Sequence, residues 1–296
     1  MQKNLNGIFL LDKPLNVSSN HALQRVKRLF HAKKAGHTGS LDPLATGMLP
    51  ICFGEATKFS QFLLESDKSY LVTATLGIKT ATGDSEGEVI AERPVENISR
   101  EKIESVLQQF RGVIQQIPPM YSAIKYQGKP LYSLARKGIE VERKPREVNI
   151  YELSLQDVGE KSFSLEIHCS KGTYVRTLIE DIGEELQCGA HVSQLRRPFV
   201  NPYQQHKMYT FEEIESFTES ALENTLLPVE TSLNAFQAIK LSTSAAFYMR
   251  MGQPVMVSQL HYKGLVRMYS DNDRFLGVGE VLDDGRVAPR RLVKTS

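Results

Sequence analysis

The sequence predicts an α+β fold that is followed by a small β domain. Strand-like and helix-like segments mix along most of the chain, without the regular strand–helix alternation of a doubly wound parallel sheet. The last part of the chain carries short strand-like runs that are separated by turn residues such as Asp284-Gly285. We therefore expect one mixed α+β domain and, beyond a boundary between Pro228 and Gln237, a small β-barrel or sandwich.

The first elements follow from hydrophobic periodicity. Residues 7–11 have the pattern of a short buried strand that ends in a Lys-Pro turn. Ser18 or Ser19 can cap a helix that extends to about Phe30 and carries apolar residues at helical spacing. Residues 35–50 are rich in glycine and proline, so we expect an ordered loop or a string of turns there.

Later segments show equally clear patterns. Strand-like segments have every second residue apolar, and helix-like segments carry a capping residue or an apolar stripe. They comprise strands at 69–76 and 162–169, and helices that begin at Ser99, at about Tyr174 (ending near Gln187) and at the Thr210–Glu213 capping box. The C-terminal domain adds strand-like runs at 255–257, 265–269 and 275–282.

The distribution of charge indicates an anionic partner. The 296 residues carry 36 basic and 34 acidic side chains, so the net charge is only +2. The positive charge is concentrated, however, with a net +5 in residues 1–60, +5 in residues 111–150 and +4 in residues 236–296. Charge asymmetry of this kind is typical of proteins that bind a polyanion such as RNA.

Other features argue against a membrane protein or a metal site. No window approaches the roughly 18 apolar residues that a transmembrane helix needs, and the start of the chain has no signal-peptide core. Cys52, Cys169 and Cys188 are scattered and form no CxxC pair, so neither disulfides nor a structural zinc site is expected. We expect a cytoplasmic protein whose thiols are reduced.

Asp42 is the most informative residue of the glycine- and proline-rich segment. It is the only acid between Asp12 and Glu55, in a stretch with six basic side chains. Neighbouring cations favour its ionised form and would also attract a polyanion. A surface that only binds phosphate needs no central carboxylate, which favours a chemical role for Asp42. Spacing alone leaves an alternative, in which Asp42 caps a turn or a helix that begins at Pro43.

The stretch GHTGSLDPLATGMLP, which surrounds Asp42, closely resembles the signature of the TruB family of tRNA pseudouridine synthases. Three further segments resemble the same family in the right order, namely GIFLLDKP at 7–14, DKSY at 67–70, and CSKGTYVRTL at 169–178 with its sequel to Arg197. The resemblance covers about residues 7–200, and the C-terminal piece resembles a PUA RNA-binding domain. Asn16 stands where the family usually has glycine, a conservative change because asparagine tolerates a left-handed backbone.

The resemblance implies a fold and a reaction. The fold would be a mixed, mainly antiparallel pseudouridine-synthase catalytic domain at 1–232, with a basic thumb insertion at about 118–148 and a PUA-like domain at 237–296. The reaction would convert uridine 55 in the T-loop of tRNA to pseudouridine, with Asp42 as the nucleophile on a flipped-out uridine. The resemblance implies no cofactor and no metal.

Arg176 is the arginine of the GTYxR motif in this resemblance. Its implied role is to pair with Asp42, hold it ionised and fix its direction, which a guanidinium can do through two parallel hydrogen bonds. Without the motif, a surface ion pair with Glu180, four residues later on the same helix, is the alternative.

The resemblance also implies residues that surround the base. Tyr70 and Tyr174 would contact the flipped uracil, and Tyr70 could relay the proton from C5. Leu195 would close the pocket from the other side, and His37 would fill the stack that the base leaves. Each of these residues also has a plain structural interpretation, as a half-buried tyrosine, a core leucine or a surface histidine.

Basic residues predict where RNA would be held. The 111–150 block interleaves lysines and arginines with tyrosines, as expected of an RNA-gripping insertion, although a solvated loop would have the same composition. The side chains that we expect to bind RNA are Lys13, Lys125, Lys129, Arg136, Arg143, Arg146, Arg196 and Arg290.

The leading hypothesis is therefore a standalone isomerase that acts as a monomer on the T-stem-loop of tRNA, with no guide RNA. A tRNA-binding or RNA-folding protein without catalysis is the first alternative, and a carboxylate-based hydrolase of a ribosyl bond is the second. The presence of Asp42, Tyr70 and Arg176 together favours the isomerase. The sequence offers no clear second catalytic acid near Asp42, which disfavours the hydrolase.

Overall fold

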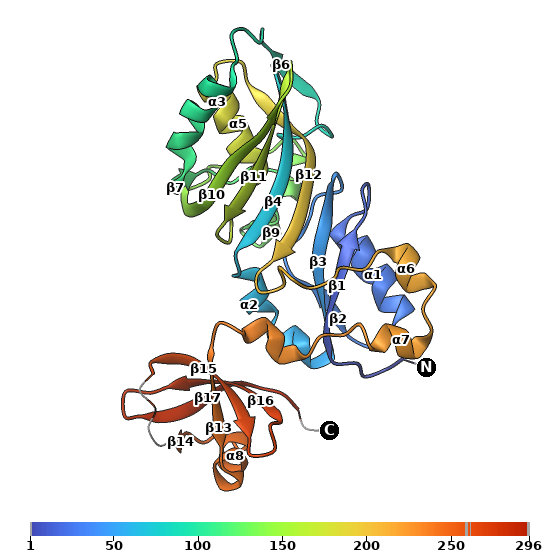
Figure 1. The fold of residues 1–296 in the computed structure, drawn as a ribbon, viewed down its shortest axis with the longest axis vertical. Helices are drawn as coiled ribbons and strands as arrows, with labels where there is room; N and C mark the ends of the chain where they lie inside the picture. Colours follow the sequence, from blue (N-terminus) through green and yellow to red (C-terminus); the bar gives the residue numbers. More distant parts are fainter. Residues whose placement is uncertain (1, 258–259, 261, 295–296) are drawn as a thin grey trace.

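A large mixed sheet organises the chain in the structure, a computed structural model that describes residues 2–257, 260 and 262–294. The sheet fills the upper part of Figure 1, and a smaller sheet lies at the lower end of the elongated molecule. The large sheet contains, in spatial order, β1 (Gly7–Lys13), β3 (Ala45–Phe53), β12 (Ala190–Val200), β4 (Lys68–Leu76), β11 (Ser162–Cys169), β10 (Arg146–Val158) and β7 (Gly112–Gln116), with β2 (Ala35–His37) paired to β3.

The sheet is mainly antiparallel, as expected. Among the described pairings of this sheet, β12 and β3 run parallel and all other neighbours run antiparallel. β4 and β11 match the strands predicted at 69–76 and 162–169, and their apolar residues point into one buried core. Because alternate residues of a strand face opposite sides of the sheet, this periodicity already determined which side chains would be buried.

Helices cover the sheet on one face in its upper half. α3 (Arg100–Leu107) and α5 (Val175–Glu185) lie side by side there, and their apolar stripes share the core of β4 and β11. Ser99 caps α3 as predicted, since its hydroxyl accepts a hydrogen bond from the Lys102 amide. A short hairpin, β5 (Ile78–Thr80) with β6 (Val89–Glu92), and a 3₁₀ turn at Gln108–Phe110 complete this half.

The lower half of the large sheet is buried on both faces. Alternate residues of β1 enter two different cores, with Phe9 and Leu11 on one side and Ile8 and Leu10 on the other. The helices and 3₁₀ turns around it are α1 (Ser19–Leu29), η1 (Gly54–Lys58), α2 (Ser60–Leu64), α6 (Phe211–Glu215), α7 (Glu219–Glu223) and η3 (Val229–Leu233).

The predicted caps of this half are confirmed. The Ser18 hydroxyl accepts a hydrogen bond from His21 N and starts α1, while Thr210 and Glu213 form the capping box of α6. Asn16 adopts φ 60°, so it supplies the left-handed residue for which glycine is the usual choice.

The expectation of a loop over residues 35–50 is wrong for most of that segment. Residues 35–37 form β2, and residues 45–50 belong to β3, where Pro50 lies opposite Leu10 of β1. Glycine and proline commonly mark turns, but here Gly47 has φ 104° within β3 and lets the backbone of Arg197 approach closely. Only residues 38–44 remain as a loop, and Asp42 lies in it.

The close approach at Gly47 predicts a large effect on stability. A Cβ atom on Gly47 would lie 2.3 Å from the Arg197 carbonyl oxygen. We expect Gly47→Ala to lower the free energy of unfolding by about 2–4 kcal/mol, measured by urea denaturation. Gly36→Ala is the matched control, because a Cβ there meets nothing within 4 Å. Equal stability of the two variants would contradict the prediction.

The smaller sheet contains the C-terminal part of the chain. Its spatial order is β13 (Gln237–Leu241), β15 (Gly264–Ser270), β16 (Phe275–Val281), β17 (Arg286–Leu292) and β14 (Val255–Met256), with α8 (Thr243–Arg250) beside it. The predicted runs at 255–257, 265–269 and 275–282 correspond to β14, β15 and β16, whereas β13, β17 and α8 were not predicted. The described residues form one sheet here rather than the two of a sandwich.

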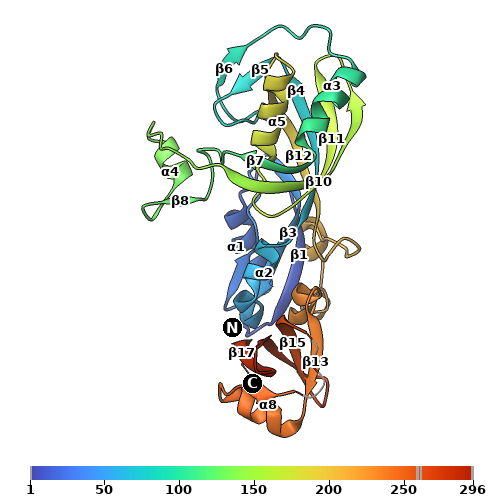
Figure 2. The same cartoon turned by 90° about the vertical axis from the view of Figure 1, so that its left-hand side faces the viewer.

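A projection leaves the large sheet between β7 and β10. It contains the hairpin β8 (Lys125–Tyr126) with β9 (Lys129–Pro130) and the helix α4 (Leu131–Ala135), and Figure 2 shows it extending to the side of the molecule. It coincides with the basic block predicted from the sequence, although β10 already begins at Arg146. In the described part of the chain, no helix is long and apolar enough to cross a membrane.

Candidate active site

A pocket of about 400 Å³ gathers the predicted site residues from distant parts of the chain. It lies between the 38–44 loop, β4, the start of α5, β12 and the root of the projection. All six residues predicted for catalysis and base binding line it, namely His37, Asp42, Tyr70, Tyr174, Arg176 and Leu195.

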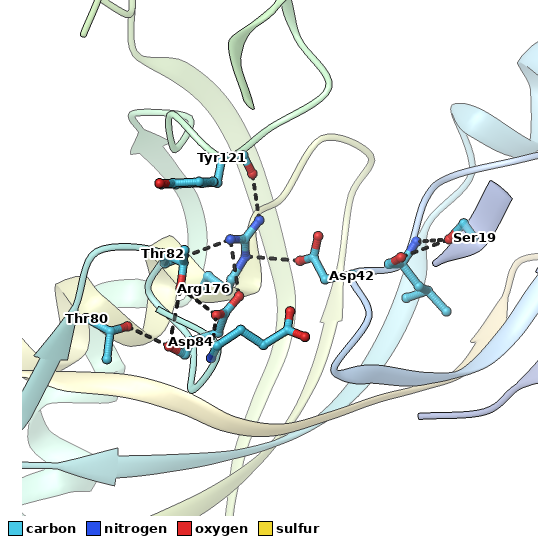
Figure 3. A network of polar contacts seen from close by, with 9 residues as sticks. Ser19, Asp42, Thr80, Thr82, Asp84, Tyr121 and Arg176 are labelled. Atoms are coloured by element: carbon cyan, nitrogen blue, oxygen red, sulfur yellow. Dashed lines mark hydrogen bonds and ion pairs between the residues drawn. The ribbon is translucent and has the colours of Figure 1, made fainter. Parts of the chain in front are cut away.

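Asp42 is held at this pocket by its loop. The Leu41 amide donates to the Ser19 hydroxyl at 2.7 Å and the Leu41 carbonyl accepts from it at 2.8 Å, which ties the loop to α1. The Asp42 carbonyl accepts from Ala45 N at 3.0 Å, so a turn does form. The Asp42 carboxylate, however, contacts Arg176, with 3.1 Å between Oδ2 and Nε (Figure 3). The carboxylate is therefore directed to the pocket and not to capping the turn.

Arg176 is surrounded by acceptors. Its side chain is 7% exposed, and Nη1 and Nη2 donate to the carbonyls of Thr82 (2.8 Å) and Tyr121 (2.7 Å). Asp42 contacts the guanidinium at Nε, and the described residues show no second contact between these two side chains, so the expected pair of parallel hydrogen bonds is not formed. Glu180 is not among the ion-pair partners of Arg176 in the described residues, so the alternative pair is not formed either.

A second carboxylate, Asp84, shares Arg176 with Asp42. Arg176 Nη1 lies 3.3 Å from Asp84 Oδ2, and Asp84 is 2% exposed. The Glu86 amide and the Thr82 hydroxyl donate to the other oxygen, Oδ1, and fix the carboxylate. Asp84 could not be predicted from the sequence, because no local pattern connects it to Arg176, 92 positions later.

The protonation of Asp42 depends on opposing effects. Burial raises the pKa of Asp42 above its usual value, Arg176 and Lys13 lower it, and Asp84 raises it further. The cations do favour the ionised form, as expected, but burial has the larger effect and the net direction of the pKa shift is upward. The side chain is still 40% exposed, so water also reaches the carboxylate. Arg176 thus opposes a loss of charge that burial would otherwise favour.

The two predicted tyrosines line the pocket from different elements. Tyr70 lies on β4, is 8% exposed, and has a pKa raised by burial. Tyr174 immediately precedes α5, and burial raises the pKa of its phenol while the Ser122 hydroxyl lowers it. Leu195 on β12 is 8% exposed and belongs to the main core as well as to the pocket wall. Both phenols are therefore protonated donors at neutral pH.

Strand alternation separates two neighbouring arginines. Leu195 and Arg197 line the pocket, whereas Arg196 lies on the reverse face of β12, in a pair with Asp12 at 2.7 and 2.9 Å. Arg197 is 1% exposed and donates to the carbonyls of Met48 and Gly39. Arg196 is therefore not part of this pocket, and RNA binding by its 41% exposed side chain stays a prediction. Arg197 was missed, although its position two residues after Leu195 would have placed it on the pocket face.

Lys13 also differs from its prediction. It is 0% exposed, and its ammonium donates to the carbonyls of Pro14 (2.8 Å) and Val17 (2.7 Å). Burial lowers its pKa to about 8. Lys13 fixes the turn after β1 and adds positive charge near Asp42, and its contact with RNA stays a prediction that this burial disfavours.

His37 ends β2 at the edge of the pocket. Burial lowers its pKa and Arg197 lowers it further, which favours the neutral ring. Its Nδ1 atom is buried without a hydrogen-bond partner among the residues that the structure describes.

Most of the other predicted RNA-binding side chains are exposed. Lys125, Lys129, Arg136 and Arg146 are exposed, and Arg136 lies over the ring of Tyr132. Arg143 is half-buried and bonds to the Pro118 carbonyl and to Glu140, while Arg290 pairs with Glu280. No group of three or more potential metal-binding side chains was found within the described residues.

Models of one protein family match nearly the whole chain. Residues 27–175 match the model for the N-terminal domain of the TruB family pseudouridylate synthases, residues 176–234 match the tRNA pseudouridylate synthase B C-terminal domain, and residues 238–293 match the C-terminal model of pseudouridine synthase II TruB.

Two relatives are similar over nearly their full length. The chain is 58% identical over 294 residues to the tRNA pseudouridine synthase B of Coxiella burnetii (strain RSA 493 / Nine Mile phase I), covering 98% of this chain and 95% of that protein. It is 53% identical over 305 residues to the protein of the same name from Yersinia pestis (strain Pestoides F), covering 99% and 94%.

Solved structures share the fold at low sequence identity. A Cbf5-Nop10-Gar1 complex contains a chain with TM-score 0.75 and 23% identity, covering 97% of this chain and 84% of that one. An H/ACA RNP bound to a substrate RNA containing 2'-deoxyuridine gives TM-score 0.74 and 21% identity, covering 98% and 85%. The family models and the relatives more than 50% identical lead to one conclusion: this chain belongs to the TruB family of pseudouridylate synthases.

Proposed function

We propose that this chain isomerises uridine 55 in the T-loop of tRNA to pseudouridine, with Asp42 as the nucleophile on a flipped-out uridine. The observation that carries the proposal is the contact of Asp42 with Arg176 in a pocket lined by two tyrosines and a leucine. The names of the relatives from Coxiella burnetii and Yersinia pestis, tRNA pseudouridine synthase B, support tRNA as the substrate.

The reaction needs a carboxylate with a free oxygen. The N1–C1′ bond of the uridine breaks, the uracil turns, C5 bonds to C1′, and the proton at C5 leaves while N1 gains one. Asp42 Oδ2 contacts Arg176, so Oδ1 is the oxygen that can attack C1′ or stabilise a developing oxocarbenium ion. Arg176 keeps this carboxylate ionised and directed, because two backbone carbonyls hold the guanidinium.

The apolar and aromatic wall suits an extruded base. Tyr70 and Tyr174 would contact the uracil, and Leu195 would close the pocket on the opposite side. The Tyr70 hydroxyl is our candidate for relaying the C5 proton, and His37 would occupy the space that the base leaves in the RNA stack. Asp42 is partly exposed whereas Tyr70 is buried. This difference supports a pose in which the sugar lies at the mouth of the pocket and the base lies further in.

The RNA would be held by the projection and by the C-terminal sheet. We assign residues 1–232 to the catalytic domain, about 118–148 to a thumb, and 237–296 to a PUA-like domain, of which 258–259, 261 and 295–296 lie outside the described residues. Exposed cations interleaved with tyrosines support the thumb assignment. Arg290 is our candidate contact from the C-terminal domain, and it would exchange its Glu280 partner for phosphate.

The function is tested with an unmodified tRNA transcript and purified protein. We expect pseudouridine at a single T-loop uridine, without added cofactor, guide RNA or second protein. A protein that binds tRNA but only folds it would leave every uridine unchanged, and a ribosyl hydrolase would release free uracil. Chemical mapping of pseudouridine together with chromatography of free bases distinguishes these three results.

Binding should depend steeply on salt. The slope of log K against log salt reports the number of phosphate contacts, and each contact contributes roughly 0.7–0.9 to it. We expect the triple variant Lys125→Ala, Lys129→Ala and Arg136→Ala to lower the slope by about 2–3. Lys161→Ala, which removes an exposed lysine outside the three basic blocks, should leave it unchanged. An unaltered slope in the triple variant would remove the argument for the thumb.

A further inference from the structure

Gln116 forms a double hydrogen bond with the backbone of Tyr174. Its Oε1 accepts from Tyr174 N at 2.8 Å, and its Nε2 donates to the Tyr174 carbonyl at 3.0 Å. Gln116 is 2% exposed and is the last residue of β7, directly before the projection. The side-chain amide therefore pairs with the backbone N–H and C=O of Tyr174, as a neighbouring strand would, although Tyr174 lies 58 positions later.

No side-chain capping hydrogen bond is found at the start of α5 (Val175–Glu185) in the described part of the chain. Tyr174 is the N-cap residue, it is in an extended conformation (φ −99°, ψ 106°), and its own side chain makes no capping hydrogen bond. Its carbonyl also accepts from Leu178 N, so Gln116 uses the second lone pair of that oxygen. Both backbone groups of Tyr174 are thereby occupied, which restricts its φ and ψ and hence the direction of its side chain.

The same turn of α5 is attached to the projection a second time. Arg176 Nη2 donates to the Tyr121 carbonyl at 2.7 Å, as Figure 3 shows. Residues 116–121 thus contact residues 174–176 at both ends. Tyr174 and Arg176, which both line the pocket, are placed by these contacts at the root of the projection.

We propose that Gln116 is a positioning residue for the reaction, which acts by fixing the backbone of Tyr174. The proposal rests on the proposed function, because it assumes that the Tyr174 side chain contacts the reacting uracil. Gln116 is buried and does not line the pocket, so we expect it to make no contact with the substrate. Loss of its two hydrogen bonds lets Tyr174 rotate. Displacement of a substrate-contacting group by about 1 Å can cost up to about 100-fold in rate.

A double-mutant cycle tests this proposal. Gln116→Met keeps the length and volume of the side chain and removes both hydrogen bonds. In the full-length protein we expect it to lower the single-turnover rate on a T-stem-loop RNA roughly 10- to 100-fold, with tRNA affinity changed less than about threefold. In a Tyr174→Ala background the same substitution should lower the rate less than about twofold, because no side chain remains to be positioned.

Gln115→Met is the matched control. Gln115 is the adjacent residue of β7, faces solvent, and should tolerate the substitution in both backgrounds with an unchanged rate. Should Gln116→Met fail to fold, as judged by its thermal unfolding, Gln116→Asn keeps the amide, shortens its reach by one methylene, and provides the same comparison.

Two results would overturn the proposal. Equal losses of rate in the Tyr174 and Tyr174→Ala backgrounds would mean that Gln116 supports the fold in general. No loss of rate in either background would mean that the two hydrogen bonds between Gln116 and Tyr174 have no effect on the reaction. Absence of pseudouridine with the wild-type protein would instead contradict the proposed function, so the two failures are distinguishable.

Discussion

Asp42→Asn should abolish formation of pseudouridine, with a loss of rate of about 10⁴-fold or more, which corresponds to about 5.5 kcal/mol in the activation barrier. Asparagine has the same shape as aspartate but cannot attack C1′ or balance a developing positive charge. It can still contact Arg176 Nε through its side-chain oxygen, so the pocket should keep its structure. Single-turnover conversion of a tRNA transcript measures the rate, and filter binding measures the affinity, which should stay within about threefold.

Asp157→Asn is the control for the chemistry of the substitution. Asp157 is an exposed carboxylate on β10, away from the pocket, and its amide variant should convert tRNA at the wild-type rate. Turnover by Asp42→Asn at more than one-hundredth of the wild-type rate would show that another group is the nucleophile. Loss of tRNA binding in that variant would instead mean that Asp42 contributes to affinity.

Arg176→Lys should lower the rate about 10²- to 10³-fold, although it keeps the positive charge. The guanidinium serves Asp42, Asp84 and the carbonyls of Thr82 and Tyr121 at the same time. One ammonium group cannot reach all four in the same geometry, so Asp42 loses its fixed direction. The retained charge still partly compensates the buried Asp84, so the loss of stability should be smaller than in Arg176→Gln.

The control for this substitution is Arg93→Lys. Arg93 forms an exposed pair with Glu184, so the exchange of arginine for lysine there should change neither rate nor stability measurably. If Arg176→Lys retained the full rate, a simple positive charge would be sufficient, and the directed contact with Asp42 would have no importance for catalysis.

The pH dependence should respond to Arg176 in a defined direction. Arg176 lowers the pKa of Asp42, so Arg176→Gln raises it. Because the reaction needs the carboxylate, the rate falls as pH drops through the pKa of Asp42. The acid limb of the pH–rate profile should therefore move to higher pH in Arg176→Gln than in the wild type. An acid limb at the same or lower pH would contradict the assigned interaction.

Local sequence patterns predicted the elements whose signals are short in range. Alternation of apolar residues predicted β4 and β11, and the caps at Ser18, Ser99 and Thr210 predicted where three helices begin. These signals succeeded because each depends on neighbours within one strand or one helical turn. The loop expected at 35–50 was wrong because β3 is stabilised by β1 and β12, both distant in sequence.

The site also contains residues that the sequence predicted and residues that only the structure revealed. Asp42 was predicted from its isolation in a basic segment and, like the other five pocket residues, from the resemblance to the TruB family. Asp84 and Gln116 could not be predicted because each has a partner far along the chain. Strand alternation after Leu195 would have placed Arg197 on the pocket face, whereas charge alone does not tell on which face of β12 Arg196 lies.

The sequence by itself determined the family, the candidate nucleophile and the three basic blocks, since these depend on residue identity and local spacing. Only the tertiary structure decided the protonation and direction of Asp42, because burial, Arg176 and Asp84 act on it through space. Lys13 illustrates the difference most directly. Its charge was counted as a contact for RNA, but the fold buries the ammonium against backbone carbonyls, where it fixes a turn instead.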